Sequence, residues 1–398
     1  MAAIPCTAMA DDIMPDFKDT LTGNWNGERD KLKAEGIEIG VTDYFDAFAS
    51  AEGGQKILNN VNLNILLDGN KLVNIQGLSA LFSVLQTNGS QPSRTLTGAV
   101  QRIDDMETER RGLEVYQAWL QQEFFGGGVS ALAGVYDATN EFYSTTASDI
   151  LINNAYGFGT ELAATGRKGE AIFPTSAAAA RLRLQPTKQL YLQAAVMDGI
   201  NSAPETRQPI RLNGNSSALV IGEGGYVKMT DAVETAKIAF GAWRYTDQVK
   251  SIFQDQDKTA AYISGGEYSL AEGYIFRKPG SSRGLMAFVR MGIADREVDR
   301  FNYSFSAGLD FKGILKTRAK SELALSIADA HLSPVYREAL NAQGIASNSG
   351  ETALELTYRD YLRPWVSLQP DLQYIINPDG LKSQQNGAIF GLRTEINF

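Results

Sequence analysis

The chain has 398 residues, of which 43% are hydrophobic and 21% charged, and its formal net charge is -9. A single cysteine and a single histidine exclude a disulfide framework and Cys/His metal clusters, and the negative charge argues against a nucleic-acid partner. No run of 18 apolar residues occurs, so all-β secreted proteins, outer-membrane barrels and large acidic enzymes are the classes that fit.

The N-terminus predicts an exported protein. Residues 1–10 end in Ala8-Met9-Ala10, a small-x-small pattern that suits cleavage by signal peptidase, and we interpret them as the remnant of a signal peptide. Cleavage there would remove Cys6, the only cysteine. An ordinary N-terminal tail is the alternative interpretation.

Residues 11–36 are expected to form an N-terminal periplasmic segment with a short helix. Asn24 or Asn26 can cap the start of this helix, because an asparagine side chain accepts a hydrogen bond from the first free N–H groups. Gly36 can end it in the left-handed conformation that glycine adopts easily.

From residue 37 onward, polar and apolar residues alternate with a period of two, which is typical of strands. The predicted strands are residues 37–50, 59–68, 77–86, 113–124, 128–136, 176–184, 189–197, 217–228, 233–245, 262–276, 284–294, 301–311, 319–328, 351–360, 365–376 and 388–398. Most have about ten residues, enough for a tilted strand to cross a bilayer. Pro370 is expected at a bulge, because proline lacks the N–H that a sheet requires.

Alternation by itself fits both a soluble β-sandwich and a transmembrane β-barrel. Connection lengths favour the barrel, because tight turns such as 185–188 alternate with long polar loops such as 198–216 and 329–350. Bacterial barrels have short periplasmic turns and long extracellular loops. The terminal Phe398 also resembles the signal that the barrel-assembly machinery reads. We therefore predict an all-β fold, a transmembrane antiparallel β-barrel of about 16 strands over residues 37–398.

Several sequence blocks resemble the carbohydrate-selective porins of OprB type. They are Leu21-Thr22-Gly23-x-Trp25-x-Gly27-x-Arg29-x-x-Leu32 followed by Gly36-Ile37, YQAWLQQEFF at 116–125, ARLRLQPT at 180–187, and the C-terminal ETALELTYR, PWVSLQPDLQYIINP and GAIFGLRTEINF. The resemblance implies an outer-membrane porin of a Gram-negative bacterium, through which monosaccharides such as glucose diffuse passively into the periplasm. Gln117 stands where the family pattern has Glu, and regions 160–175 and 200–216 depart from that pattern.

Alternation also predicts which side chains face the lumen, where a sugar needs hydrogen-bonding groups and aromatic faces. The candidate pore-lining and substrate-contacting residues are Trp119, Glu123, Arg181, Arg183, Glu355, Arg359, Trp365, Asp371 and Arg393. Any of them can instead be plain lumen lining, and a register shift of one residue would place both tryptophans in aromatic girdles. Loop 87–112 or loop 137–175 is expected to fold inward, and the mixed-charge run 102–111 is a further candidate.

An enzyme is not expected, because GxSxG, P-loop, HExxH and CxxC motifs do not occur, and neither a cofactor nor a metal site is predicted. His331 is expected in a surface loop. Two alternatives stay open: a general or anion-preferring diffusion porin, and a secreted carbohydrate-binding β protein or hydrolase. The expected partners are small-molecule sugars, outer-membrane lipid and lipopolysaccharide, and the barrel-assembly machinery through Phe398. The sequence leaves open whether the chain is a monomer or a homotrimer.

Overall fold

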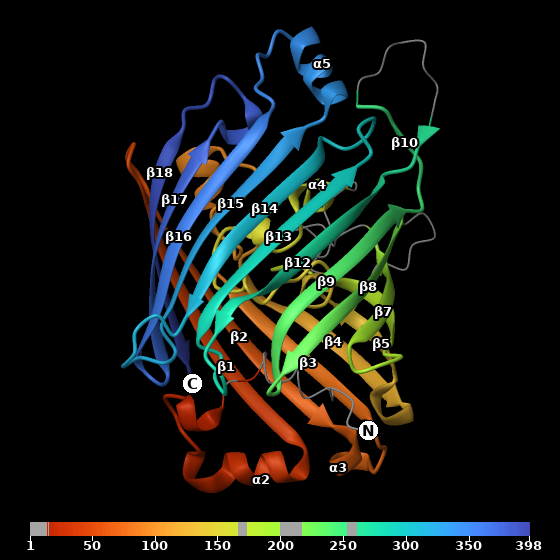
Figure 1. Cartoon of the computed structure of the whole chain (residues 1–398), viewed down its shortest axis with the longest axis vertical. Coiled ribbons are helices and arrows are strands. Elements are labelled where there is room, and N and C mark those ends of the chain that lie inside the picture. The colour runs from red at the N-terminus through yellow and green to blue at the C-terminus, as the bar shows by residue number, and fades with distance from the viewer. Residues whose placement is uncertain (1–13, 15, 166–172, 200–216, 253–260) are drawn as a thin grey trace.

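The computed structural model describes all residues except 1–13, 15, 166–172, 200–216 and 253–260. Its main feature is a closed antiparallel barrel in which each strand pairs with its neighbours in the chain and β1 closes the ring against β18 (Figure 1). The predicted signal-peptide remnant, residues 1–10, lies outside the described residues.

The barrel strands are β1 (Ile37–Ser50), β2 (Gln55–Asp68), β3 (Leu78–Thr87), β4 (Gly112–Phe124), β5 (Val129–Tyr136), β6 (Ala177–Leu184), β7 (Leu190–Asp198), β8 (Ala218–Thr230), β9 (Val233–Tyr245), β12 (Gly265–Arg277), β13 (Gly284–Ala294), β14 (Phe301–Lys312), β15 (Glu322–Leu332), β16 (Gly350–Arg363), β17 (Val366–Ile376) and β18 (Gly387–Asn397). The expected set of strands is confirmed, with shifts of a few residues at their ends. A further short pair, β10 (Val249–Lys250) and β11 (Ala261–Tyr262), lies in a loop where none was expected.

Short helices occupy the connections. They are α2 (Glu28–Glu35), α3 (Gly69–Val73), α4 (Thr160–Ala163), α5 (Pro334–Ala342), the 3₁₀ turns η1 (Phe17–Asp19), η2 (Trp25–Gly27), η4 (Phe125–Gly127), η5 (Ala138–Asn140), η6 (Asn154–Tyr156) and η7 (Pro378–Gly380), and the π turn η3 (Ser93–Thr97). Within the described residues, no helix has both the length and the apolar character needed to cross a membrane.

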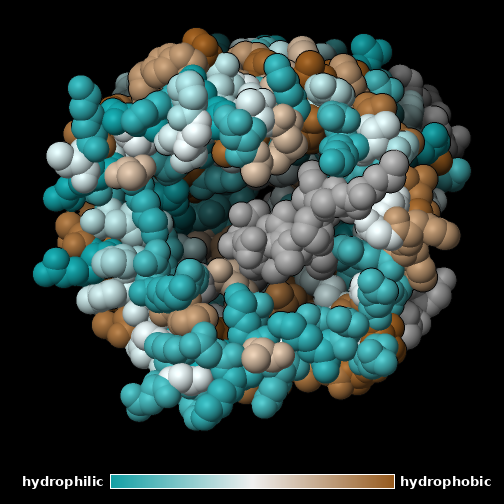
Figure 2. Space-filling view, turned by 60° about the horizontal axis from the view of Figure 1, so that its bottom comes forward, coloured by the Kyte–Doolittle hydropathy of each residue, from teal (hydrophilic) through white to brown (hydrophobic). Residues whose placement is uncertain are grey.

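The alternation of each strand separates an apolar outer face from a polar inner face. On β4, for example, Leu120 is 59% exposed on the outside, whereas Gln121 beside it is buried inside the barrel. Figure 2 shows hydrophilic residues around a hollow at the lower end of the barrel, with hydrophobic residues towards the periphery. The outer face therefore suits contact with lipid.

Connections at the two ends of the barrel differ in length as expected. The lower end in Figure 1 has tight turns such as 231–232 and 364–365, and the upper end has long loops such as 333–349. The upper connection 51–54 is a short exception. His331 lies within β15, not in a loop as expected, and its Nδ1 is 2.9 Å from the Asp329 carboxylate.

Helix α2 lies below the barrel, next to the C-terminus (Figure 1). Its N-cap is Gly27, so the expected asparagine cap is wrong; Asn24 nevertheless accepts a hydrogen bond from the Asp30 N–H through its side chain at 3.1 Å. Gly36 ends the helix with φ 98°, as expected. Arg29 is buried and donates to the carbonyl oxygen of Phe398 at 2.7 Å, which fastens the helix to the end of the last strand.

Pro370 is not at a bulge, which corrects the expectation. It pairs in register with Leu392 of β18, and the ladder with β16 keeps the same register on both sides of it. In the β16–β17 ladder, Gln369 and Pro370 have no paired residue on β16, so the N–H that proline lacks produces a local gap in the pairing. The strand does not contain the extra residue of a bulge at this point. The shift in this pair of strands lies further along, between Tyr361 and Arg363.

Candidate functional site

Two long loops fold into the barrel (Figure 1): the first inner loop, residues 88–111, and the second inner loop, residues 137–165. We expected one of them to fold inward, and both do. Their backbones carry hydrogen-bonding groups that need partners once they leave water. Inward side chains of the barrel wall supply many of these partners, so the wall and the loops together shape the lumen.

Glu351 and Glu355, four residues apart on the inner face of β16, each hold one loop. Glu351 accepts hydrogen bonds from the backbone N–H groups of Val100 and Gln101 in the first inner loop at 2.9 and 2.7 Å. Glu355 accepts from Ile152 and the residue after it in the second inner loop at 2.6 and 3.1 Å. Both oxygens of Glu355, a predicted pore residue, are therefore engaged by the loop.

Other strands of the barrel wall repeat this arrangement. Glu272 of β12 accepts from the N–H groups of residues 146 and 147 at 3.0 and 2.8 Å, and Glu223 of β8 accepts from Tyr143 N–H at 2.8 Å. Arg290 of β13 donates to the carbonyl oxygens of residues 156 and 157. We call Glu223, Glu272, Glu351 and Glu355 the loop-binding glutamates.

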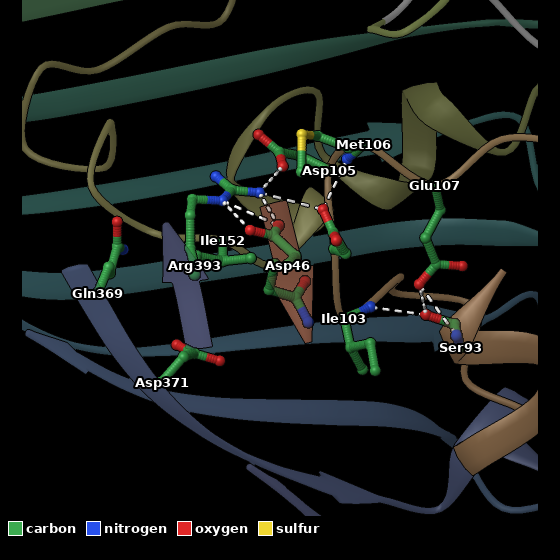
Figure 3. A network of polar contacts seen from close by, with 12 residues as sticks. Asp46, Ser93, Ile103, Asp105, Met106, Glu107, Ile152, Gln369, Asp371 and Arg393 are labelled. Carbon is green, nitrogen blue, oxygen red and sulfur yellow. Dashed lines mark hydrogen bonds and ion pairs between the residues drawn. The ribbon is translucent and has the colours of Figure 1, made fainter. Parts of the chain in front are cut away.

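Arg393, a predicted pore residue on β18, joins three carboxylates (Figure 3). Its guanidinium lies 2.8 Å from Asp46 of β1, and 3.1 and 2.7 Å from Asp104 and Asp105 of the first inner loop. Burial beside the negative charge of Asp46 raises the pKa of Asp104 well above its usual range. The arginine thus neutralises a wall carboxylate and fixes the loop at the same time.

Two predicted arginines of β6 have different environments. Arg181 is buried and forms an ion pair with Glu141 of the second inner loop at 2.7 Å, with further hydrogen bonds to Ser130 and Gln121. Arg183 is less buried; it donates to Gln193 at 3.1 Å. Arg181 is therefore a loop contact, and Arg183 lies nearer the lower mouth.

The remaining predicted residues do not form one group. Trp119 faces inward but packs in an apolar cluster, and its Nε1 donates to Gln117 at 3.2 Å, while Glu123 faces inward near the end of β4. Trp365 lies in the turn between β16 and β17, so its assignment to an inward position on a strand is wrong. Asp371 is buried and accepts from Gln373 Nε2 at 2.8 Å.

Two cavities accompany the inner loops. The inner cavity, of about 370 Å³, is lined by wall residues that include Tyr44, Asn60, Asn62, Arg359, Gln369 and Arg393 and by both loops. The outer cavity, of about 400 Å³, is lined mainly by the first inner loop together with Arg300 and Asp379. Asn154 lines both cavities, which places the second inner loop between them.

The inner cavity is polar, and its charges are largely paired. Arg393 faces its three carboxylates, and Arg359, predicted as a pore residue, is paired with Glu322. Asparagine, serine and threonine side chains make up much of the remaining lining, with aromatic side chains such as Tyr44 and Tyr156 between them. Within the described residues, no group of His, Cys, Asp and Glu side chains is placed to hold a metal ion. The amide, hydroxyl and aromatic side chains of this lining are groups that neutral, hydroxyl-rich solutes can contact.

A comparison with known protein families matches residues 54–398 to the carbohydrate-selective porin family, OprB. The chain belongs to this family. It is 20% identical to Porin B of Pseudomonas aeruginosa over 95% of this chain and 91% of that protein, and 21% identical to the putative porin QuiX of Acinetobacter baylyi over 98% and 95%. The high-pH structure of Pseudomonas putida OprB matches with a TM-score of 0.86 and 19% identity, covering 96% of this chain and 98% of that one.

The chain is therefore a carbohydrate-selective porin of the Gram-negative outer membrane, through which sugars diffuse passively. The solved structure supports the fold, a closed antiparallel barrel with a short helix near the N-terminus. Because bacterial barrels carry long loops on the extracellular side and short turns on the periplasmic side, the upper loops are extracellular and the lower turns periplasmic.

Sequence reasoning missed most of the residues that hold the porin's inner loops. Alternation would have placed the loop-binding glutamates on the inner face, since Glu351 precedes Glu355 by four residues on one strand. Their partners, however, are backbone groups in a loop, between 80 and 251 residues away in the sequence. No periodic signal in the sequence links the two, so the contacts became visible only in the folded chain.

Proposed function

We propose that this porin passes monosaccharides such as glucose, one at a time, through the inner cavity into the periplasm. The observation that carries the proposal is the lining of that cavity, where amides, hydroxyls and aromatic faces lie beside Arg359 and Arg393, whose charges are paired. A volume of about 370 Å³ lies at the small end of the range for small-molecule sites, which favours single sugar units.

In this proposal the predicted pore residues have two roles. Arg359 and Arg393 line the sugar path, and Arg183 lies toward its exit. Arg181 and Glu355 hold the second inner loop in place and so determine the width of the path. We infer no catalytic role for any of them, and the protein acts as a channel and not as an enzyme.

The test is swelling of liposomes that contain the purified porin, with glucose, a disaccharide, an uncharged amino acid and gluconate as solutes. Faster entry of glucose than its size explains, relative to the amino acid, supports sugar selectivity. Entry that follows solute size alone supports a general diffusion porin, and preferential entry of gluconate supports an anion-preferring one. Absence of swelling by protein shown to be inserted would refute the channel.

We further propose that residues 1–10 belong to a signal peptide, residues 11–36 form a periplasmic segment, and residues 37–398 form the barrel. The barrel-assembly machinery reads Phe398, whose N–H also donates to the carbonyl oxygen of Val41 at 2.9 Å as the barrel closes. Lipid and lipopolysaccharide cover the apolar outer face.

Deleting Phe398 is expected to lower the amount of heat-modifiable protein in the outer membrane. Native mass spectrometry distinguishes a monomer from a homotrimer.

A further inference from the structure

We propose that Asn60 on β2 is a specificity-determining residue of the inner cavity, where its amide binds hydroxyl groups of the permeating sugar. This inference rests on the proposed passage of monosaccharides through that cavity and adds a contact within it. Asn60 belongs to the cavity lining, yet it is only 1% exposed. Neither its Nδ2 nor its Oδ1 has a hydrogen-bond partner in the part of the chain that the structure describes.

The asparagines of β2 are not equivalent, although Asn60, Asn62 and Asn64 all share the inner face. Asn62 also lines the cavity, but its Oδ1 already accepts a hydrogen bond from the Ser83 hydroxyl at 2.9 Å. Asn64 lies one step nearer the periplasm and is outside the cavity lining. Among the three, Asn60 is therefore the asparagine that lines the cavity and has both amide atoms available to a solute.

Its neighbours limit what can satisfy this amide. Tyr44 lies directly opposite Asn60 in the β1–β2 register and lines the same cavity, with the Arg393 guanidinium 5.6 Å from the centre of its ring. On the other side, Thr87 is opposite Asn60 on β3, and its hydroxyl accepts from the Gly89 N–H at 3.2 Å. The flanking side chains thus offer an aromatic face and an engaged hydroxyl.

A buried amide without partners is unfavourable, and a solute that supplies both a donor and an acceptor relieves this. A sugar hydroxyl has both capacities, so two adjacent hydroxyls can pair with Nδ2 and Oδ1 together. The apolar C–H face of the same sugar can pack on the Tyr44 ring, which joins an apolar surface to a polar tip. Binding requires the Asn60 side chain to turn toward the cavity when the sugar arrives.

Such a site discriminates by hydroxyl pattern and not by size. A group built to bind a substrate hydroxyl rejects an analogue that lacks it, because its own polar atoms are then left unpaired. One neutral hydrogen bond in exchange with water changes a binding constant by about 2- to 10-fold. We expect glucose to exceed at least one of its singly deoxygenated analogues in permeation rate by that factor.

The experiment measures liposome swelling with glucose and with each monodeoxyglucose, which are nearly equal in size. The test variant is Asn60→Leu, which keeps the branched shape of the side chain and removes the amide, and Asn60→Gln is the conservative rescue. Asn64→Leu is the matched control on the same face of the same strand. Heat-modifiable migration on a gel verifies that each variant is folded before it is compared.

The expected result is that Asn60→Leu loses the preference for glucose over the affected analogue, by about 2- to 10-fold, while the rate for that analogue stays the same. Asn60→Gln restores part of the preference, and Asn64→Leu keeps all of it. An unchanged preference in Asn60→Leu would overturn the role of Asn60 and leave sugar selectivity intact. Wild-type rates that follow size alone would refute sugar selectivity itself, and this site with it.

Discussion

The substitution Glu355→Gln tests whether the barrel wall holds the second inner loop. In the wild type the two carboxylate oxygens accept from the backbone N–H groups of Ile152 and Asn153 at 2.6 and 3.1 Å. Glutamine has one acceptor oxygen, and its amino group would face an N–H donor. The variant therefore loses one hydrogen bond, weakens the other and leaves a buried N–H without a partner.

The size of the effect follows from these two contacts. A hydrogen bond to a charged group contributes about 1.5–3 kcal/mol, and an unpaired buried group costs about 1–3 kcal/mol. Relief of the repulsion between Glu355 and Asp371 offsets part of this loss. We expect a net destabilisation of the loop position of about 2–4 kcal/mol, which corresponds to roughly a 30- to 1,000-fold rise in the equilibrium constant for loop opening.

Hydrogen exchange followed by mass spectrometry measures this opening directly. Peptides that contain Ile152 and Asn153 should exchange faster in Glu355→Gln, and a disaccharide should permeate faster relative to glucose. The control is Glu322→Gln on β15, which makes the same change in charge while its ionic partners, Arg359 and Lys312, both lie on barrel strands. Unchanged exchange in Glu355→Gln, or an equal rise in both variants, would refute the reasoning.

Three further substitutions test other contacts of the lumen. Arg181→Met leaves the buried Glu141 without its ionic partner and is expected to cost about 3–5 kcal/mol in urea unfolding, most of it recovered by adding Glu141→Leu. Burial raises the pKa of Glu107 to about 7 from 4.5, so this carboxyl stabilises the first inner loop most below pH 4.5 and its contribution falls by about 3 kcal/mol as pH rises to 7; hydrogen exchange should show this dependence, and Glu107→Gln should weaken it. Arg393→Gln leaves the carboxylates around it unneutralised, so the reversal potential in a salt gradient should shift toward cation preference, and an unshifted potential would contradict this.

The barrel could be predicted from the sequence because alternation acts locally. One polar and one apolar residue per pair, as in Asn60 to Ile65, separates the two faces of a strand and shows where each strand lies, and the lengths of the connections then favour a barrel over a sandwich. The wrong predictions lie at the ends of strands and helices, where the local pattern does not show at which residue the element begins. Trp365 was assigned to a strand that begins one residue later, and the cap of α2 is a left-handed glycine and not an asparagine.

The candidate site was predictable only in part, because the inner loops have no period. Alternation predicted Arg393 and Arg359 on the inner face, and both line the inner cavity, but it could not show that their charges are already paired there. It also could not distinguish Glu355, whose oxygens hold a loop, from a residue that faces solute. These differences depend on contacts between the wall and loop segments far away in the sequence.

The pairing of charges explains how a lumen with many ionic side chains can suit a neutral solute. A free arginine or carboxylate in the path would attract counter-ions and bind water strongly, so a neutral sugar would gain little by replacing that water. In this porin, wall charges such as Arg181 and Glu355 are used to fix the loops, and Arg393 compensates carboxylates of wall and loop together. The groups left to face the inner cavity are then mainly amides, hydroxyls and aromatic rings, beside the Glu395 carboxylate that accepts from Asn397, and the contacts of such neutral groups with sugar are comparable in strength to those with water. The residues that bind the inner loops therefore determine the width of the path, whereas residues such as Asn60 determine which sugars pass most readily according to their hydroxyl pattern. Substitutions of loop-binding residues should then change discrimination by solute size, and substitutions of residues such as Asn60 should change discrimination by hydroxyl pattern.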